Sequence, residues 1–336
     1  FKRWSVKTIL VTGGFGFIGS RLVEDLSKTC KVIVLDNKDT YGTVDQGTKK
    51  IMYQTRTKRW QLERVHVVEG DIMNQRDCLK AFSYQPDVVV HLAAYPRAQI
   101  VDDNPVLGIP KLVTGTTNLL YNADKFDTKR FVYVSSSMVY GDFKDGVKED
   151  ADTKPINIYG EAKLMGERLT KLFCKKNNMD YIIVRPSGVY GKYDLPDRVI
   201  PKFFAKAMDN AKITLHNGSN KVDFTYKNDI IRGLKKCALE SHVKNQSFNI
   251  TNGNAHSLRE LADEVLLLTG STSEVEDVGA HDMYPMRGTL DISKAKELLK
   301  WEPETTFKEG LKKYYESVNW NTIYRFVWTI WRVSVR

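Results

Sequence analysis

A tyrosine and a lysine four residues apart could work as a pair in proton transfer. Tyr159 and Lys163 lie in the segment IYGEAKLMGERL, which begins at Ile158. Residues four apart share one face of a helix, so both side chains could point at the same ligand. Tyrosine titrates at about 10, and a nearby positive charge is needed to make it a base at neutral pH. Such pairs also occur by chance, so the elements around them have to supply the context.

Short apolar runs alternate with longer amphipathic segments in the first half of the chain. Strands this apolar, separated by helices, are typical of a parallel sheet covered on both faces. Right-handed crossovers between them give a doubly wound α/β fold. The predicted strands cover residues 8–12, 31–36, 65–71, 87–94, 130–136 and 181–186, and the predicted helices cover 17–28, 75–83, 104–125 and 157–177.

After residue 186 this pattern loosens, which indicates a smaller C-terminal α/β lobe. A further strand at 247–251 is expected to rejoin the main sheet. Helices are predicted at 257–269 and 293–299.

A glycine-rich turn follows the first predicted strand. In VTGGFGFIGSRLVEDL, glycines fall at positions 13, 16 and 19, between a strand and an amphipathic helix. Gly13 permits the tight turn, Gly16 lets the backbone approach a pyrophosphate, and Gly19 lets the helix pack closely on the strand. The N-terminus of the helix favours the negative charge of the pyrophosphate. The sequence therefore predicts a Rossmann-type dinucleotide site.

A carboxylate ends the second predicted strand. Asp36 can accept hydrogen bonds from the ribose hydroxyls of an adenosine, and it would repel a 2′-phosphate, so NAD is favoured over NADP. Asp71 and Ile72 end the third strand, where the adenine lies in such a fold. His91, near the end of the fourth strand, is predicted to be a structural histidine.

Ligands of open α/β sheets bind beyond the carboxyl ends of the strands. The serines of VSSSMVYG, at positions 135 to 137, end the fifth strand and are expected near the cofactor. Tyr159 and Lys163 follow about twenty residues later and can point back to the same place.

Composition excludes several other classes of protein. Apolar residues make up 42% and charged residues 27% of the 336 residues, as in ordinary globular proteins. The four cysteines lack metal-ligand spacing, so no metal site is predicted, and reduced thiols fit a cytoplasmic location. The net charge of +10 is spread along the chain, which does not argue for nucleic-acid binding, and the run QTRTKRWQLER is typical of a solvated helix face.

No apolar run is long enough to span a bilayer, which takes about 20 residues. The C-terminal stretch NWNTIYRFVWTIWRVSVR combines aromatic residues with arginines. It could dock on a partner chain or lie on a membrane surface.

The ordered set of motifs resembles the extended short-chain dehydrogenase/reductases, specifically the NAD-dependent nucleotide-sugar epimerases and dehydratases. The resemblance covers about residues 7–315. Its carriers are TGGFGFIG, Asp36, GDI, HLAA, GTTNLL, SSSMVYG, YGEAK, RPSGVYG, DFTYKNDI and RGTLDISKAKELLKWEPETTFKEGL.

This resemblance implies a catalytic set of Ser136, Tyr159 and Lys163. Tyr159 would remove a proton from a sugar hydroxyl, Ser136 would hold that hydroxyl, and Lys163 would lower the pKa of Tyr159 and bind the nicotinamide ribose. The residues expected to contact NAD are Gly13, Phe15, Gly16, Phe17, Ile18, Gly19, Asp36, Asn37, Asp71, Ile72, Leu92, Ala93, Ala94, Ser135, Tyr159, Lys163, Pro186 and Val189.

The same resemblance favours C4 epimerisation of a UDP-hexose through a 4-keto sugar. The family's dehydratases carry an acid pair where this chain has Ser137 and Met138, which argues against 4,6-dehydration. Alternatives are a keto-sugar-nucleotide reductase or dehydrogenase, a 4,6-dehydratase of the same family and, in another class, a non-catalytic NAD-sensing or RNA-binding protein.

The chain departs from the family at several substrate positions. Leu112 replaces an asparagine that contacts the cofactor, and Gly188 stands where many members of the family have an asparagine after the sixth strand. Val222 replaces the arginine that clasps the substrate diphosphate, so Lys221 or Arg287 is expected to do so. The predicted substrate contacts are Arg97, Ser136, Ser137, Gly188, Pro201, Lys221 and Arg287.

The resemblance also implies a homodimer, formed through the helices at about 104–125 and 157–177. The predicted organisation is an NAD-binding domain at 1–186 that 223–255 rejoins, a substrate-binding lobe at 187–222 and 256–315, and a tail of unknown role at 316–336.

Overall fold

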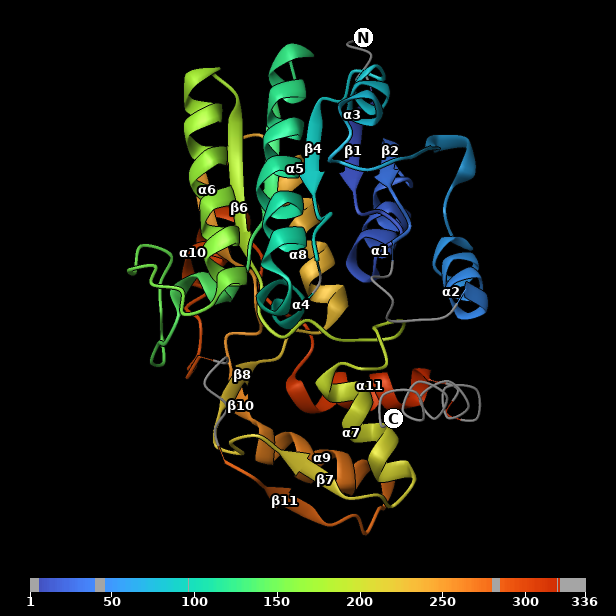
Figure 1. Cartoon of the computed structure of the whole chain (residues 1–336), viewed down its shortest axis with the longest axis vertical. Coiled ribbons are helices and arrows are strands. Elements are labelled where there is room, and N and C mark those ends of the chain that lie inside the picture. Colours follow the sequence, from blue (N-terminus) through green and yellow to red (C-terminus); the bar gives the residue numbers. More distant parts are fainter. Residues whose placement is uncertain (1–5, 40–45, 96, 280–284, 319, 321–336) are drawn as a thin grey trace.

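The computed structural model describes residues 6–39, 46–95, 97–279, 285–318 and 320. A seven-stranded parallel sheet occupies the upper half of the molecule in Figure 1, and a smaller lobe lies below it. The predicted doubly wound α/β class is therefore confirmed. In spatial order, the sheet contains β3 (Val65–Glu69), β2 (Lys31–Asp36), β1 (Thr8–Thr12), β4 (Val88–His91), β5 (Arg130–Val134), β6 (Asp180–Arg185) and β9 (Gln246–Asn249).

The strand order reverses between β1 and β4. β1 pairs with β2 on one side and with β4 on the other, with Thr12 opposite His91. The connections on the two sides of this point diverge, which leaves a crevice at the carboxyl ends of the strands. β9, which includes part of the predicted strand at 247–251, pairs in parallel with β6.

Helices cover both faces of the sheet because alternate strand residues point to opposite faces. The helices over the first face are α1 (Phe17–Leu26), α8 (Lys227–Leu239) and α10 (Ser293–Leu299), and those over the second are α3 (Gln75–Phe82), α5 (Pro105–Lys125) and α6 (Ile158–Lys176). On β1, Ile9 and Val11 pack in the core of the first face, whereas Leu10 packs in the core of the second. The short helix α4 (Ala98–Asp103) precedes α5.

The lower lobe has its own apolar core, which includes Phe204, Leu261 and Leu311. Two capping boxes begin its helices, Ser257 with Glu260 and Thr306 with Glu309, and each satisfies backbone N–H groups that the helix leaves open. Its elements are α7 (Val199–Met208), β7 (Ile213–Leu215), β8 (Lys221–Asp223), β10 (Ala255–Ser257), α9 (Leu258–Thr269), β11 (Val275–Asp277) and α11 (Phe307–Ser317). β8 pairs with β10 and β7 with β11.

One stretch assigned to the lobe from sequence packs elsewhere. Ala295, Leu299 and Trp301 belong to the core under the main sheet, and the Trp301 indole Nε1 donates to the Asp229 carbonyl at 3.1 Å. The chain therefore returns from the lobe to the sheet domain over α10 before it enters α11.

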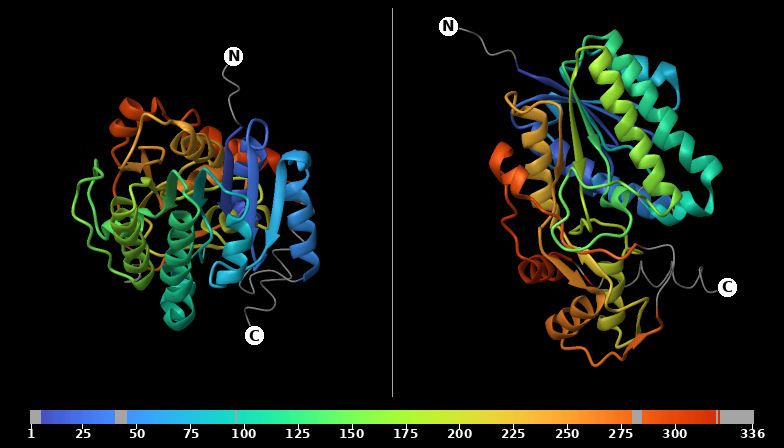
Figure 2. Two further views of the ribbon diagram at one scale, coloured as in Figure 1. Left: turned by 90° about the horizontal axis from the view of Figure 1, so that it is seen from above. Right: turned by 90° about the vertical axis from the view of Figure 1, so that its left-hand side faces the viewer.

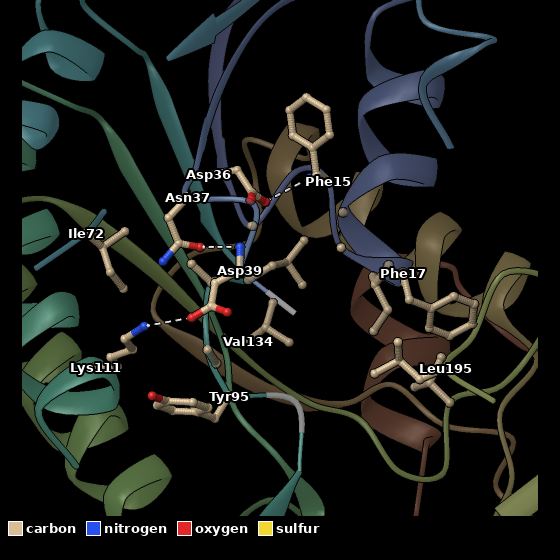
Figure 3. A pocket seen from close by; sticks show the side chains of 18 of the residues that line it. Phe15, Phe17, Asp36, Asn37, Asp39, Ile72, Tyr95, Lys111, Val134 and Leu195 are labelled. Atoms are coloured by element: carbon tan, nitrogen blue, oxygen red, sulfur yellow. Dashed lines mark hydrogen bonds and ion pairs between the residues drawn. The ribbon is translucent and has the colours of Figure 1, made fainter. Parts of the chain in front are cut away.

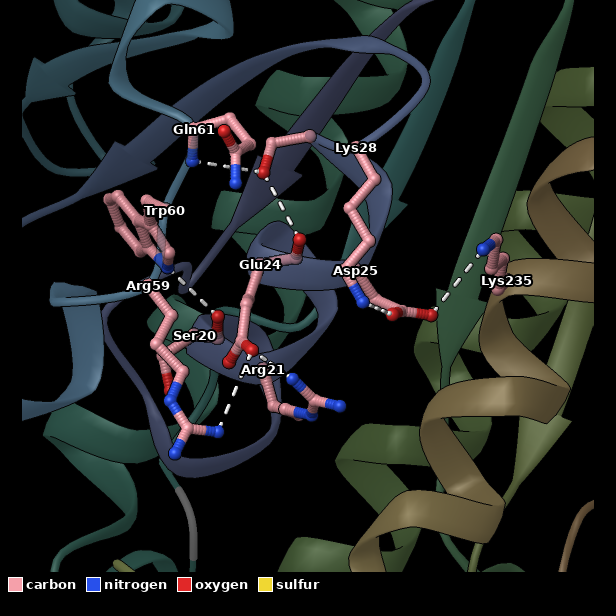
Figure 4. A network of polar contacts seen from close by, with 10 residues as sticks. Ser20, Arg21, Glu24, Asp25, Lys28, Arg59, Trp60, Gln61 and Lys235 are labelled. Atoms are coloured by element: carbon pink, nitrogen blue, oxygen red, sulfur yellow. Dashed lines mark hydrogen bonds and ion pairs between the residues drawn. The ribbon is translucent and has the colours of Figure 1, made fainter.

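The run QTRTKRWQLER is solvated only in part, because Lys58, Arg59 and Arg64 are exposed as its charges suggest, whereas Arg56 and Trp60 are buried. α2 (Gln46–Thr57) ends inside the run, and both Arg56 and Trp60 are 6% exposed. The Trp60 indole Nε1 donates to the Ser20 carbonyl at 2.9 Å, so the segment is fastened to α1 (Figure 4). Arg59 and Lys235 reach acidic residues of α1 from either side of that network. The Trp60 side chain explains the burial, because its large apolar ring favours the core and its N–H group needs a hydrogen-bond partner there.

The four cysteines are free and buried. None of the helices in the described part of the chain is long and apolar enough to cross a membrane. The predicted docking or membrane contact of the tail lies almost wholly outside the described residues, which reach Val318 and include Trp320.

Candidate active site

A cavity of about 300 Å³ opens at the carboxyl ends of the strands, where the order reverses. Every residue predicted to contact NAD lines it, as do Ser136, Tyr159 and Lys163. Figure 3 shows its walls: Phe15 and Asp36 lie at one end, Lys111 and Tyr95 on one side, and Phe17 and Leu195 on the other. Segments from β1 to the residues after β6 therefore converge on one space.

The glycine-rich turn forms a cradle that side chains would fill. Gly13 has φ +72°, and a Cβ on it would lie 2.8 Å from the Ala93 amide nitrogen. A Cβ on Gly19 would lie 2.1 Å from the Gly13 carbonyl oxygen. α1 begins at the turn, so its first N–H groups and its positive end face the cavity. This arrangement fits a pyrophosphate.

Asp36 lines the cavity beside that cradle. Its carboxylate accepts a hydrogen bond from the Phe15 amide at 2.9 Å (Figure 3) and another from the Lys38 amide at 2.6 Å. Burial raises the pKa of Asp36, while these two hydrogen bonds and the charge of Arg56 act in the opposite direction. A fixed carboxylate at the end of β2 fits the hydroxyls of an adenosine ribose.

A small polar network borders the same end of the cavity. The Asn37 side chain donates to the Asp71 carboxylate at 2.9 Å. The Lys111 ammonium lies 3.5 Å from the Asp39 carboxylate and 3.8 Å from that of Asp71 (Figure 3). Lys111, which belongs to α5, therefore lies next to two carboxylates at the edge of the cavity.

Two serine hydroxyls on the cavity wall have nothing to bind in the described protein. The Oγ atoms of Ser135 and Ser187 are buried and find no hydrogen-bond partner among the described residues. Buried hydroxyls are normally satisfied, so these two fit a polar ligand in the cavity.

Arg56 lines the cavity, although the basic run around it predicted that it would be exposed to solvent. Its guanidinium donates to the Phe15 carbonyl at 3.0 Å and to the Tyr193 carbonyl at 2.6 Å. Burial lowers the pKa of Arg56 to about 10, so it keeps its charge at neutral pH. Arg56 therefore fastens the segment after β6 over the glycine-rich turn. Only the Trp60 ring in the same basic run hinted that this segment was buried.

Replacing Arg56 with methionine is expected to weaken retention of the cofactor. The variant loses two charge-assisted hydrogen bonds that hold the cavity wall, and each is worth about 1.5–3 kcal/mol. Dissociation of bound NAD should become about 10-fold faster or more. Because oxidised NAD does not fluoresce, the protein is loaded with NADH, whose fluorescence during dilution measures this rate. Arg59→Met, in the same segment but with a 75% exposed side chain, should release NAD at the original rate.

Tyr159 and Ser136 meet at the floor of the cavity. The Ser136 hydroxyl is close enough to the Tyr159 side chain to lower the pKa of Tyr159 as a hydrogen-bond partner. The Ser136 Oγ also accepts the Met138 amide at 3.2 Å, which fixes the serine side chain. Burial raises the pKa of Tyr159, whereas the charge of Arg198 and the Ser136 hydrogen bond lower it.

Lys163 lies one turn after Tyr159 on α6. Its ammonium donates to the Val134 carbonyl at 2.9 Å and lies 6.0 Å from the centre of the Tyr159 ring. Burial lowers the pKa of Lys163 to about 8, and the Glu167 carboxylate acts against that shift. Glu167 is itself fixed by Arg185, at 2.9 Å and 2.7 Å in a two-point contact.

His91 is held as expected for a structural histidine. Its ring nitrogens contact the hydroxyls of Thr12 at 2.8 Å and Thr116 at 3.0 Å. Burial and, next, the charge of Lys163 lower the pKa of His91 to about 3, so the ring stays neutral.

Only some of the residues predicted to contact substrate line the cavity. Ser136 and Gly188 line the cavity, whereas Ser137, Pro201, Arg97, Lys221 and Arg287 do not. Arg97 forms an ion pair with Asp197, and the Lys221 ammonium lies 3.3 Å from the exposed Asp145 carboxylate. Ser137 is buried and its amide donates to the Pro186 carbonyl at 2.9 Å.

Sequence reasoning missed several lining residues from two loops. Asp194, Leu195 and Arg198 come from the connection between β6 and α7, and Tyr95 follows β4. The one signal in the sequence was the pair of charges, Asp197 and Arg198, between Pro196 and Pro201. Irregular segments give no periodicity that would orient their side chains.

A reversed strand order, a glycine cradle and a carboxylate at the end of β2 define a Rossmann-type dinucleotide-binding protein. The profile of the NAD dependent epimerase/dehydratase family matches residues 9–251, and the chain belongs to this family. Its cofactor is NAD.

Individual relatives cover nearly the whole chain. A UDP-glucuronate 4-epimerase of Thermodesulfobacterium geofontis is 31% identical over 324 residues, which is 93% of this chain and 95% of the relative. The human dTDP-D-glucose 4,6-dehydratase is 28% identical, over 92% and 89%. The structure is similar to that of Bacillus cereus UDP-glucuronic acid 4-epimerase in complex with UDP-glucuronic acid and NAD, with a TM-score of 0.83, 28% identity and coverage of 92% and 98%.

Proposed function

We propose that this protein interconverts a UDP-hexose and its C4 epimer through a transient 4-keto sugar. The observation that carries the proposal is that Ser136, Tyr159 and Lys163 line one wall of the NAD cavity, with the Lys163 ammonium 6.0 Å from the Tyr159 ring. The epimerase among its relatives supports the same reaction class.

The roles of the three side chains follow from their charges. Tyr159 as phenolate takes the proton of the sugar C4 hydroxyl, and Ser136 holds that hydroxyl in place. Lys163 keeps a positive charge beside the phenolate, which favours the ionised form of Tyr159. When bound, NAD supplies the hydride acceptor and afterwards the hydride donor. After the keto sugar has rotated in the site to present its other face, Tyr159 returns the proton to the oxygen at C4.

Dehydration is disfavoured by the residues at the end of β5. Ser137 and Met138 occupy the positions of the dehydratase acid pair, and both are buried away from the cavity. A hydroxyl and a thioether cannot protonate a leaving hydroxyl as a carboxylic acid does.

A turnover screen without added reductant tests the proposal. Purified protein should retain NAD and convert at least one UDP-sugar to its C4 epimer, detected by NMR. In deuterium oxide the hydrogen at C4 should remain protium, because it returns to the carbon it left. If only added NADH or NADPH supports turnover, a keto-sugar-nucleotide reductase is the function instead. If UDP-, dTDP-, GDP- and CDP-sugars all fail to react, and RNA binds in a salt-sensitive way, the protein is a non-catalytic binder.

We further propose that the enzyme is a homodimer through α5 and α6, which lie side by side on one face (Figure 2). Both helices expose large apolar side chains, including Val106 at 80% and Leu172 at 67%. On α6, Ile158, Met165 and Leu172 recur every seven residues and form one stripe. Pairing this stripe with a second copy would bury it in a four-helix interface.

Leu172→Glu is expected to shift the protein from dimer to monomer, because a charge would enter the apolar interface. Light scattering at several protein concentrations measures the mass. The control is Leu267→Glu, on α9 of the lobe, where the leucine is 74% exposed. A wild-type protein that is monomeric at all concentrations would exclude this interface.

A further inference from the structure

Three ionisable side chains follow one another along α6. Tyr159, Lys163 and Glu167 are spaced four residues apart, so they lie on one face of the helix. Lys163 is 5% exposed and Glu167 only 1%. Tyr159 and Lys163 line the cavity, whereas Glu167 does not. A carboxylate is costly to bury, so its place next to Lys163 calls for a physical reason.

An arginine of β6 fixes the Glu167 carboxylate. The two-point contact with Arg185 uses both carboxylate oxygens, and the remaining Arg185 nitrogen donates to the Tyr140 hydroxyl at 2.8 Å and the Glu149 carbonyl at 3.0 Å. Burial acts to lower the pKa of Arg185, but the hydrogen bonds and charge of Glu167 outweigh it and raise that pKa. The guanidinium therefore stays charged and holds the carboxylate in one orientation.

The other titratable groups around the tyrosine–lysine pair carry no negative charge. Burial lowers the pKa of His91 and raises that of Tyr133, so both side chains are neutral at neutral pH. The charge of Arg198, before α7, is positive and acts on Tyr159. The groups that face Lys163 are Tyr159 and Glu167 of α6, His91 of β4, Tyr133 of β5, with its ring 5.3 Å from the ammonium, and, behind Glu167, Arg185 of β6.

Tyr159 and Lys163 can hold a single proton between them in two ways. In one form Lys163 is protonated and Tyr159 is the phenolate, which can act as a base. In the other form both side chains are neutral and no base is present. Burial lowers the pKa of Lys163 to about 8 and raises that of Tyr159, so burial favours the neutral form. Because the two groups titrate as a coupled pair, a third charge can decide between the two forms.

Glu167 is placed to act on one member of this pair. A rise of about 1.5 Å per residue puts it about 6 Å along the helix axis from Lys163 and about 12 Å from Tyr159. Its negative charge therefore stabilises the protonated lysine more than it destabilises the phenolate. The Lys163 ammonium contacts the Val134 carbonyl, and both Glu167 oxygens contact Arg185, so the carboxylate acts on the lysine through space.

We propose that Glu167, held in place by Arg185, is a positioning residue that keeps the shared proton on Lys163 and thereby leaves Tyr159 as the base. The catalytic consequence rests on the proposed reaction. The inference gives a function to a buried ion pair that lies outside the cavity.

Ultraviolet titration of the NAD-loaded protein tests this role without a substrate. The phenolate band of Tyr159 is the difference between a protein and the same protein carrying Tyr159→Phe. In the double variant Glu167→Gln/Arg185→Met the band should appear at a pH about one unit higher or more, since a nearby charge shifts a pKa by about 1–3 units. For the same reason kcat at neutral pH should fall about 10-fold or more.

The double variant is chosen because removing a buried ion pair as a unit is often tolerated, whereas removing one partner leaves a buried charge without a counterion. Glu161→Gln is the matched control, because it makes the same change on α6 at a side chain that is 52% exposed. It should leave both the phenolate band and kcat as in the wild type.

The outcomes separate this inference from the proposed reaction. A band that depends on the ion pair, in a protein that converts no sugar, would support the inference and overturn the reaction. An unchanged band and an unchanged kcat in the double variant would overturn the inference alone. A lower kcat with the band still at the wild-type pH would show that the pair only supports the fold, and would also overturn it. If the double variant does not fold, Glu167→Gln is titrated in the same way, and an unmoved band there overturns the inference.

Discussion

Tyr159→Phe should lower kcat by about 10²- to 10⁴-fold, the usual contribution of a positioned acid–base group. The variant keeps the ring that packs between α4, α5 and α6 and loses only the phenol hydroxyl. The fold and the content of bound NAD should therefore be unchanged.

The measurement is kcat for the UDP-sugar identified in the screen, with circular dichroism and NAD absorbance as checks. Tyr84→Phe, which removes a phenol that contacts His66 outside the cavity, is the matched control and should leave kcat unchanged. Because the phenolate is the active form, the wild-type kcat should also fall as the pH is lowered through the acid limb of the profile. A Tyr159→Phe enzyme that works at the wild-type rate would rule out the mechanism.

Lys163→Met should lower kcat by about 10²-fold or more without lowering stability. The activity falls because Tyr159 loses the nearby positive charge that favours its ionised form. The effect on stability is expected to have the opposite sign. Burial lowers the pKa of Lys163 from 10.5 to about 8, so the folded protein holds this charge at a cost of about 3 kcal/mol at pH 7. The hydrogen bond to the Val134 carbonyl offsets part of the gain from removing it.

The pH dependence of stability checks the sign of that effect. Between about pH 8 and 10.5 the unfolded state holds a proton on Lys163 that the folded state has released. The free energy of unfolding from this group therefore rises with pH across that window. Lys163→Met should lack this rise, and its Tm at pH 7 should be no lower than that of the wild type. Lys175→Met, an exposed lysine farther along α6, should keep both the activity and the rise. A large loss of Tm at pH 7 would contradict the account of Lys163.

Local sequence patterns located the parts of the site that regular elements carry. The apolar runs predicted the parallel strands, because strands buried on both faces need apolar residues throughout. Gly13 and Gly19 could be recognised in the sequence because a tight turn against a helix leaves no space for a Cβ and therefore requires glycine. Tyr159 and Lys163 were readable because a helix puts residues four apart on one face.

The substrate side of the site was not readable in the same way. Lys221 and Arg287 carried the expected charge, yet neither lines the cavity, and the Lys221 ammonium lies beside Asp145 instead. Arg56 was hidden in a run whose charges predicted solvent, and the Trp60 ring pulled that run onto α1. In each case the outcome depended on contacts between segments far apart in the chain.

The sequence by itself determined that this chain would fold as a doubly wound sheet with a dinucleotide site and a tyrosine–lysine pair at its edge. Backbone geometry and helix periodicity are local, and the residues that meet their demands can be recognised in place. Only the tertiary structure decided which charged side chains line the cavity. That choice depends on how the connection between β6 and α7 crosses from the sheet to the lobe, which no periodic pattern encodes. Arg198 therefore lines the cavity, while Arg97, Lys221 and Arg287 do not.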